Sequence, residues 1–251
     1  MTPVQSPVQS PIQSPAQSLQ DKIASLDWPQ IQTNLNERGH ATTGPLLTPS
    51  ECSDLAAGYN NASQFRSRVI MSKHGFGRGE YQYYNYPLPT IIQTLRDNLY
   101  PTLARIATQW SRDLNHPIDY PPQHKQFLEE CHAAGQTRPT PLLLQYQPGD
   151  YNCLHQDLYG DLVFPIQATF LLSAPGTDFT GGEFVLTEQR PRMQSRVEVV
   201  QLQQGEAVLF AVNHRPQRGT RGIYRVAMRH GVSTIRSGHR FTLGVIFHDA
   251  R

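Results

Sequence analysis

Cysteine is scarce in this chain, with three among 251 residues. Cys52, Cys131 and Cys153 are odd in number and widely spaced, which is unlike the disulfide framework of a small secreted protein. They also lack the paired spacing of a zinc site. We therefore expect free thiols in a reducing, cytoplasmic setting. Cys153 is expected to be a small buried apolar residue.

Long apolar runs and a strong charge of either sign are also missing. No run is long enough to cross a bilayer, and the N-terminus lacks the basic and apolar regions of a secretory signal, so no membrane association is expected. The net charge of +2 is too small to indicate nucleic acid by itself. A chain of 251 residues can bury one substantial core, and we expect a single domain over residues 21–251.

The first twenty residues have a different composition from the rest. A four-residue pattern begins at Pro3 and recurs at Pro7, Pro11 and Pro15, each time ending in Gln-Ser. This segment has almost no charge and too few apolar groups to offset the entropy of ordering. Residues 1–20 are predicted to form a disordered tail, either inert or a ligand for a proline-recognising adaptor.

Residues 21–140 are predicted to be largely helical support. Thr48-Pro49-Ser50-Glu51 is a capping box that opens a helix to about Tyr59. Apolar positions at helical spacing predict a long helix over 90–110, bent near Pro101. A third helix is expected over 123–134, and alternation over 65–71 indicates a strand.

Residues 141–251 have the pattern of an antiparallel β-structure. Strands are expected over 162–172, 183–187, 197–202 and 207–212, with an apolar run over 241–247. Such strands can return the chain to its starting edge and close a jelly roll. The predicted fold is therefore mainly β with N-terminal helices: a double-stranded β-helix (jelly-roll) core over 141–251, buttressed by helices.

One short motif suggests a metal centre. His155 and Asp157 are two residues apart, so they share a strand face or straddle a strand end. His230 can join them if the strands between return to the same edge. Two imidazoles and one carboxylate on one face of Fe(II) leave the opposite face open, as in non-haem iron oxygenases that use O2. Cys153 could also face this site.

His214 is the alternative third ligand. It lies in a segment whose Pro216 and Gly219 indicate a loop, with Arg225 eleven positions later. Because a loop positions a ligand less well than a strand, His230 is favoured. No metal role is expected for His239, a neighbour of Arg240, or for His248, which we expect at the surface.

Over roughly 141–250 the chain resembles the Fe(II)- and 2-oxoglutarate-dependent dioxygenases of the double-stranded β-helix type, through the motif above and Arg240-Phe241-Thr242. The resemblance implies hydroxylation of a C–H bond with release of succinate and CO2. It implies that Arg240 pairs with the distal carboxylate of 2-oxoglutarate, assisted by Thr242, a role that suits the planar guanidinium. Tyr146 resembles a cosubstrate-contacting tyrosine of the prolyl-hydroxylase-like branch.

The whole chain is similar to a bacterial branch assigned to oxidative demethylation of damaged DNA, which implies alkylated DNA or RNA as the substrate. The glycine-rich segment 74–80, followed by tyrosines over 81–86, is either a substrate-covering loop or a hairpin with aromatic packing. From it we select Arg78, Glu80 and Tyr81 as candidate substrate residues.

The distribution of charge near the C-terminus also bears on which substrate the protein binds. Residues 190–251 contain eleven arginines against three acidic residues, a net +8. Arg215, Arg218, Arg221 and Arg225 fall in one predicted loop, which could be a mobile segment that grips phosphates or a solvated loop with scattered ion pairs. A protein (prolyl-type) hydroxylase is the alternative function. A noncatalytic jelly-roll binding module is disfavoured because the ligand and anchor set is complete.

Overall fold

The computed structural model describes residues 17–251. The expected disordered tail lies mostly outside this range. Its predicted boundary at residue 20 is wrong, because helix α1 (Leu19–Ala24) begins earlier. The side chain of Ser18 accepts a hydrogen bond from the backbone N–H of Asp21 and so caps the helix N-terminus.

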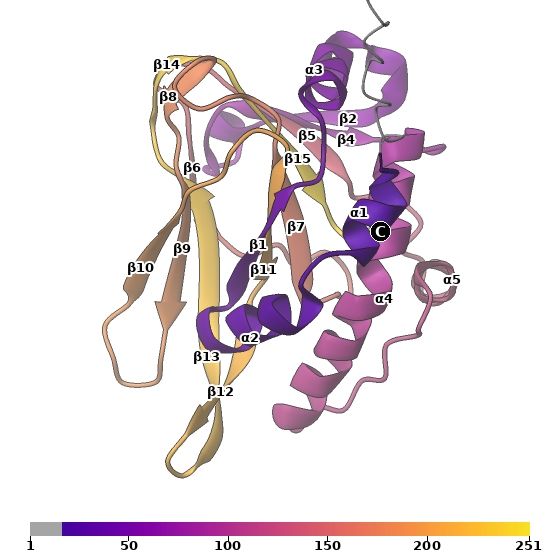
Figure 1. Cartoon of the computed structure of the whole chain (residues 1–251), viewed down its shortest axis with the longest axis vertical. Coiled ribbons are helices and arrows are strands. Elements are labelled where there is room, and N and C mark those ends of the chain that lie inside the picture. The colour runs from indigo at the N-terminus through magenta and orange to yellow at the C-terminus, as the bar shows by residue number, and fades with distance from the viewer. Residues whose placement is uncertain (1–16) are drawn as a thin grey trace, which may run out of the picture.

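A seven-stranded antiparallel sheet forms the centre of the molecule (Figure 1). Strand β7 (Ile166–Leu171) is buried at every position because the sheet is covered on both faces. It pairs with β11 (Glu206–Ala211) on one side and with β15 (Arg240–Val245) on the other. The order is completed by β1 (His40–Pro45) beyond β11, and by β5 (Leu142–Tyr146), β4 (Glu80–Tyr84) and β2 (Phe65–Ile70) beyond β15.

A second sheet faces the first across an apolar core. Its order is β10 (Arg196–Val200), β9 (Phe184–Gln189), β13 (Gly222–Val232), β6 (Tyr151–His155) and β3 (Gly77–Arg78), and β12 (His214–Gly219) also pairs with β13. A short pair, β8 (Phe179–Gly181) with β14 (Ile235–Gly238), lies beside it. Phe184 and Leu186 of β9 pack against Val208 and Phe210 of β11 between the sheets. The predicted fold class, mainly β with added helices, is confirmed.

Helices cover the outer face of the large sheet (Figure 1). The longest, α4 (Thr90–Asp113), contains Pro101 and buries one side of its length. The others are α2 (Trp28–Arg38), α3 (Pro49–Ala57) and α5 (His124–Ala133), with short 3₁₀ turns over 58–60, 62–64 and 71–73. The capping box of α3 is present, with Thr48 and Glu51 bonded reciprocally. None of the helices within residues 17–251 combines the length and apolar character needed to cross a membrane.

The N-terminal half contributes more strand than the sequence predicted. Strands β1 and β4 lie in a region expected to be largely helical, and together with β2 they extend the large sheet. In β1, for example, His40 pairs with Phe210, 170 positions away. Strands of this kind are stabilised by pairing with distant partners, so local sequence carries little signal for them.

A buried ion pair ties α4 to the end of the large sheet. The Arg96 guanidinium and the Asp249 carboxylate are 3.0 Å apart and fully buried. Arg96 also donates to the Phe247 carbonyl at 3.1 Å, and the Tyr86 hydroxyl donates to Asp249 at 2.8 Å. The neighbouring His248, expected at the surface, is fully buried because the chain end folds under α4 and α5.

Candidate metal centre

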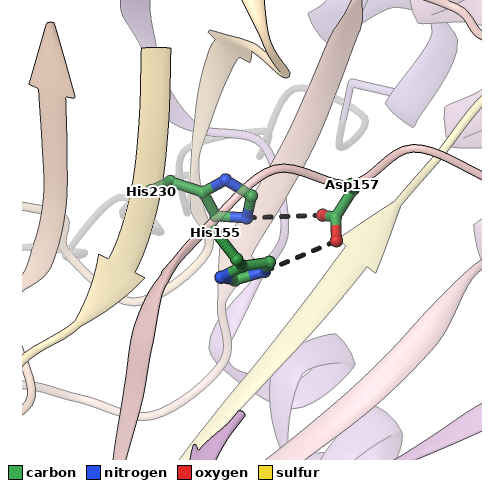
Figure 2. Close-up of side chains that lie close together, drawn as sticks. All are labelled: His155, Asp157 and His230. Carbon is green, nitrogen blue, oxygen red and sulfur yellow. Dashed lines mark ion pairs between the residues drawn. The ribbon is translucent and has the colours of Figure 1, made fainter. Parts of the chain in front are cut away.

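Two histidines of the predicted site stand side by side on neighbouring strands. His155 is the last residue of β6 and pairs directly with His230 of β13, with ring centroids 4.1 Å apart. Asp157 lies two residues beyond the end of β6, so the His155 and Asp157 motif straddles the end of that strand. The Asp157 carboxylate oxygens lie 3.4 Å from His155 Nε2 and 3.3 Å from His230 Nε2 (Figure 2). One ligand atom from each residue lies within 4.8 Å of the others, which suits a single ion.

Outer contacts orient these ligands. The Nδ1–H of His155 donates to the Cys153 carbonyl at 2.8 Å, which leaves Nε2 directed at the site. The Tyr159 hydroxyl donates to Asp157 at 2.8 Å and restrains the carboxylate. His214, the alternative ligand, pairs with Ala227 on the β12–β13 hairpin and is not part of the group.

The charge states also suit a metal. Burial by itself would raise the pKa of Asp157, but hydrogen bonds and charge from His155 and His230 hold it well below its usual range. Burial, with repulsion from His155, lowers the pKa of His230. An anionic carboxylate and a neutral imidazole are the forms that bind a metal ion.

Arg240 and the triad line the same cavity, which has a volume of about 300 Å³. Arg240 stands opposite Tyr146 across the β15–β5 pair, and it is 2% exposed. The guanidinium lies over the rings of Tyr146 and Phe179, at 5.6 and 5.7 Å from their centroids. Its Nε and Nη1 have no hydrogen-bond partner among residues 17–251. Burial lowers the pKa of Arg240 to about 10, so it remains charged at neutral pH.

An unpartnered buried cation requires an anion that the protein does not supply. Thr242, two residues along β15, also lines the cavity. A dicarboxylate such as 2-oxoglutarate can supply that anion, since Arg240 and the triad line the same cavity. The residues therefore suit both the metal and the cosubstrate that the sequence implied.

The candidate substrate residues separate into different environments. Tyr81 lines the cavity. Arg78 lies on β3, with its side chain 62% exposed and 3.9 Å from Asp150. Glu80 does not line the cavity: it is paired with Arg68 and accepts a hydrogen bond from Tyr59 at 3.0 Å. The Glu80 carboxylate is therefore engaged within the fold, and its selection as a substrate residue stays a prediction.

The cationic segment is also corrected. Residues 214–219 and 222–232 form a hairpin, not a mobile loop. Arg215 is fully buried, 2.7 Å from Glu188, and donates to the Asn36 carbonyl at 2.8 Å, so it cannot contact a phosphate. Arg218 and Arg221 are exposed near the hairpin tip, which projects at the lower end of Figure 1.

Several cavity residues were not selected from the sequence. Cys153 is exposed and lines the cavity, contrary to the expectation that it would be buried. Gln167 and Thr169 of β7 and Tyr159 also line it. A signal for the first two exists, since polar residues at alternate positions interrupt an otherwise apolar strand and therefore share one face.

Comparisons with known proteins agree with this geometry. The profile of the Oxygenase-NA family, described as "oxygenase, catalysing oxidative methylation of damaged DNA", matches residues 79–250. Uncharacterised proteins from two strains of Mycobacterium tuberculosis are each 52% identical over 164 residues, covering 65% of this chain and 70% of theirs.

Solved structures share the fold at low identity. A prolyl hydroxylase from Trichoplax adhaerens, in complex with a peptide fragment of hypoxia inducible factor, has a TM-score of 0.54 and 14% identity, over 92% of both chains. An oxidoreductase of the 2OG-Fe(II) oxygenase family from Burkholderia pseudomallei has a TM-score of 0.51 and 16% identity, covering 90% of this chain and 93% of that one. With the family profile spanning both the triad and Arg240, the chain belongs to the Oxygenase-NA family and is an oxygenase.

Proposed function

We propose that this protein is an Fe(II)- and 2-oxoglutarate-dependent dioxygenase that oxidatively demethylates alkylated DNA. The observation that carries the proposal is the presence, in one cavity, of a His-Asp-His triad and a buried arginine whose Nε and Nη1 have no hydrogen-bond partner among residues 17–251. Arg96 and Arg215 are also buried, but each is paired with a buried carboxylate of the protein.

His155, Asp157 and His230 would hold Fe(II) from one side and leave the cavity side open. When bound, the iron supplies the oxidising chemistry, coupling the conversion of 2-oxoglutarate and O2 to succinate and CO2 with hydroxylation of a C–H bond. The histidines are held in place by their strand pairing, and Asp157 is oriented by the Tyr159 hydroxyl. Fixed ligands of this kind keep the geometry that the reaction needs.

The cosubstrate would be held by residues of the large sheet. Arg240 can bind a carboxylate through two charge-assisted hydrogen bonds, and the Thr242 hydroxyl can add a third. The ring of Tyr146 covers one side of the guanidinium and excludes water from it. In such a dry setting the carboxylate and the guanidinium attract each other more strongly than they would in water.

The family description and the chemistry together support a methylated base in DNA as the substrate. Hydroxylation of an N-methyl carbon gives a hemiaminal, which breaks down to formaldehyde and the unmodified base. We therefore infer removal of the methyl group as the outcome. A base inside a duplex cannot reach the triad, so the target must be flipped out or presented in a single strand. A methylated base in single-stranded RNA would also be accessible to the triad.

A protein hydroxylase is the second candidate. It is favoured by the pairing of Tyr146 with Arg240 in the cavity, the feature that resembles the prolyl-hydroxylase-like branch. The fold is also compatible, since a prolyl hydroxylase solved with a peptide shares it.

A parallel assay separates these candidates. Formaldehyde and succinate would be measured with four substrates: methylated single-stranded DNA, the same methylated strand in a duplex, methylated RNA and proline-containing peptides. We expect formaldehyde in equal amount to the succinate that forms in addition to the DNA-free background. Hydroxylated peptide without any nucleic-acid turnover would replace the proposed function with the second candidate.

A further inference from the structure

The floor of the cavity contains a buried glutamine without a bonding partner. Gln167 of β7 is 4% exposed and lines the cavity, and its Oε1 has no hydrogen-bond partner among residues 17–251. Gln136 is also buried, but its Oε1 accepts hydrogen bonds from the backbone N–H groups of Asp161 and Leu162 at 2.9 and 2.8 Å. An unsatisfied buried acceptor is costly and rare. Gln167 therefore indicates a place for a ligand.

The strand register places Gln167 away from Arg240. Thr242 of β15 pairs with Leu171 of β7, so Arg240 lies level with Ser173. Gln167 lies six residues further along β7, about 20 Å at the rise of a strand. Its partner on β11 is Phe210, whose ring is 4.6 Å from that of His230. Gln167 therefore lies on the triad side of the cavity, apart from a carboxylate held by Arg240.

The surroundings of Gln167 define what can bind there. Thr169, 8% exposed, is the next inward residue on β7. Phe76, Leu154 and Leu158 also line the cavity and are 47%, 47% and 49% exposed, so its rim is apolar. Besides the histidines, the charged residues of the cavity lining are Asp157 and Arg240. The site thus combines apolar walls with a neutral donor and acceptor.

A nucleobase matches this combination. Its faces are apolar, and its edge presents donors and acceptors that a glutamine amide can pair with. A prolyl ring has no such edge. Building on the proposed function, we propose that Gln167 is a specificity-determining residue that binds the edge of an unstacked N-methylated base, whose faces contact the apolar rim.

The test compares Gln167→Leu with Gln82→Leu. Gln82 is a suitable control because it is a buried glutamine of the same sheet, but its amide is used within the fold, donating to the Tyr59 carbonyl at 2.7 Å. Substrates are single-stranded oligonucleotides of about ten nucleotides with one N1-methyladenine or N3-methylcytosine. Formaldehyde release is measured on the iron-loaded enzyme, and affinity for methylated and unmethylated oligonucleotides is measured on metal-free protein by fluorescence anisotropy.

We expect Gln167→Leu to lower kcat/KM for the methylated oligonucleotides by about tenfold or more, the size of one lost base-edge contact. It should also reduce the preference of the metal-free protein for methylated over unmethylated DNA. Consumption of 2-oxoglutarate without DNA, and the KM for 2-oxoglutarate, should match the wild type. Gln82→Leu should retain the wild-type preference.

Two results would overturn the assignment of Gln167 alone. One is an unchanged kcat/KM and preference in Gln167→Leu, and the other is a raised KM for 2-oxoglutarate, which would assign Gln167 to the cosubstrate. Failure of the proposed function has a different signature: wild-type protein would consume 2-oxoglutarate yet release no formaldehyde from any methylated oligonucleotide. That result would overturn both.

Discussion

Two buried arginines of this molecule have opposite environments. Arg96 has the Asp249 carboxylate at 3.0 Å and the Phe247 carbonyl at 3.1 Å. Arg240 has only the faces of Tyr146 and Phe179, and its Nε and Nη1 have no partner within the described chain. Both side chains are hidden from solvent. Burial alone therefore does not distinguish a structural arginine from a binding one; the presence of a protein anion does.

The same contrast separates the two clusters to which these arginines belong. The Arg96 cluster, which we define as Arg96, Asp249 and Tyr86, is closed, because its charges neutralise each other. The Arg240 cavity is open, because its carboxylate, Asp157, faces the two histidines and is not paired with Arg240. Mutations in the closed cluster should affect stability, and mutations in the open cavity should affect function.

The largest effect is expected at the triad. His155→Ala, Asp157→Ala or His230→Ala should each reduce succinate formation to background and weaken metal binding, because each removes one of three ligands. His214→Ala is the matched control and should retain both properties. Metal content and turnover of the four variants provide the measurement. Full activity in His230→Ala would contradict the triad.

The closed cluster should respond through stability. Arg96→Leu leaves the Asp249 carboxylate buried without its cation, which should lower the free energy of unfolding by about 3–5 kcal/mol. Urea unfolding of the two proteins at neutral pH measures this. Replacing Asp249 by Asn in the same variant should restore part of the loss. An unfolding curve that matches the wild type in Arg96→Leu would show that the pair is not structural.

Arg240→Leu should give the complementary result. Loss of the carboxylate partner should weaken 2-oxoglutarate binding by about 2–5 kcal/mol. Iron affinity should change far less, and the free energy of unfolding should stay the same or rise, since an unpaired buried charge is removed. Titrations with 2-oxoglutarate and urea unfolding test both halves. Superimposable titrations of wild type and variant would place the anchor elsewhere.

The histidine beside the closed cluster should make stability depend on pH. Burial lowers the pKa of His248 from 6.5 to about 4. Between these values the unfolded chain binds a proton that the folded chain does not, so stability falls as pH decreases through this window. The loss should reach about 3 kcal/mol near pH 4. His248→Asn should reduce this dependence in urea unfolding at pH 7, 5.5 and 4.5; identical dependence in both proteins would exclude His248 as its source.

The smallest effect is expected at the hairpin. Arg218 and Arg221 are exposed near the hairpin tip, and Arg221 lies nine residues from His230, about 30 Å along β13 and its turn. Replacing both by Gln should therefore not change the binding of a short single-stranded oligonucleotide of about four nucleotides in the cavity. Affinity across a salt series provides the test. A decrease of about 1.4 in the slope of log affinity against log salt would show that both contact phosphates, at about 0.7 per phosphate of a single strand.

How much of the site followed from sequence depends on the range of the interactions. The His155 and Asp157 pair is a local pattern, and the Arg240 motif lies on a strand with a strong apolar signal, so the structure brings them to one cavity as expected. The capping box of α3 is likewise local. Strand β1 was missed, because it depends on pairing with β11.

The sequence by itself determined the ligand types, their spacing and the positions of several strands along the chain, because these are set by local periodicity and side-chain chemistry. Only the tertiary structure decided which polar groups are paired. Arg215 and Arg240 both lie near the start of a strand, yet Arg215 is paired with Glu188, whereas Nε and Nη1 of Arg240 have no partner in the part of the chain that the structure describes. Likewise, Gln136 Oε1 accepts a backbone hydrogen bond, whereas Gln167 Oε1 has no partner among residues 17–251. Partners are chosen by long-range packing, and it is the missing partner that distinguishes a binding residue from a structural one.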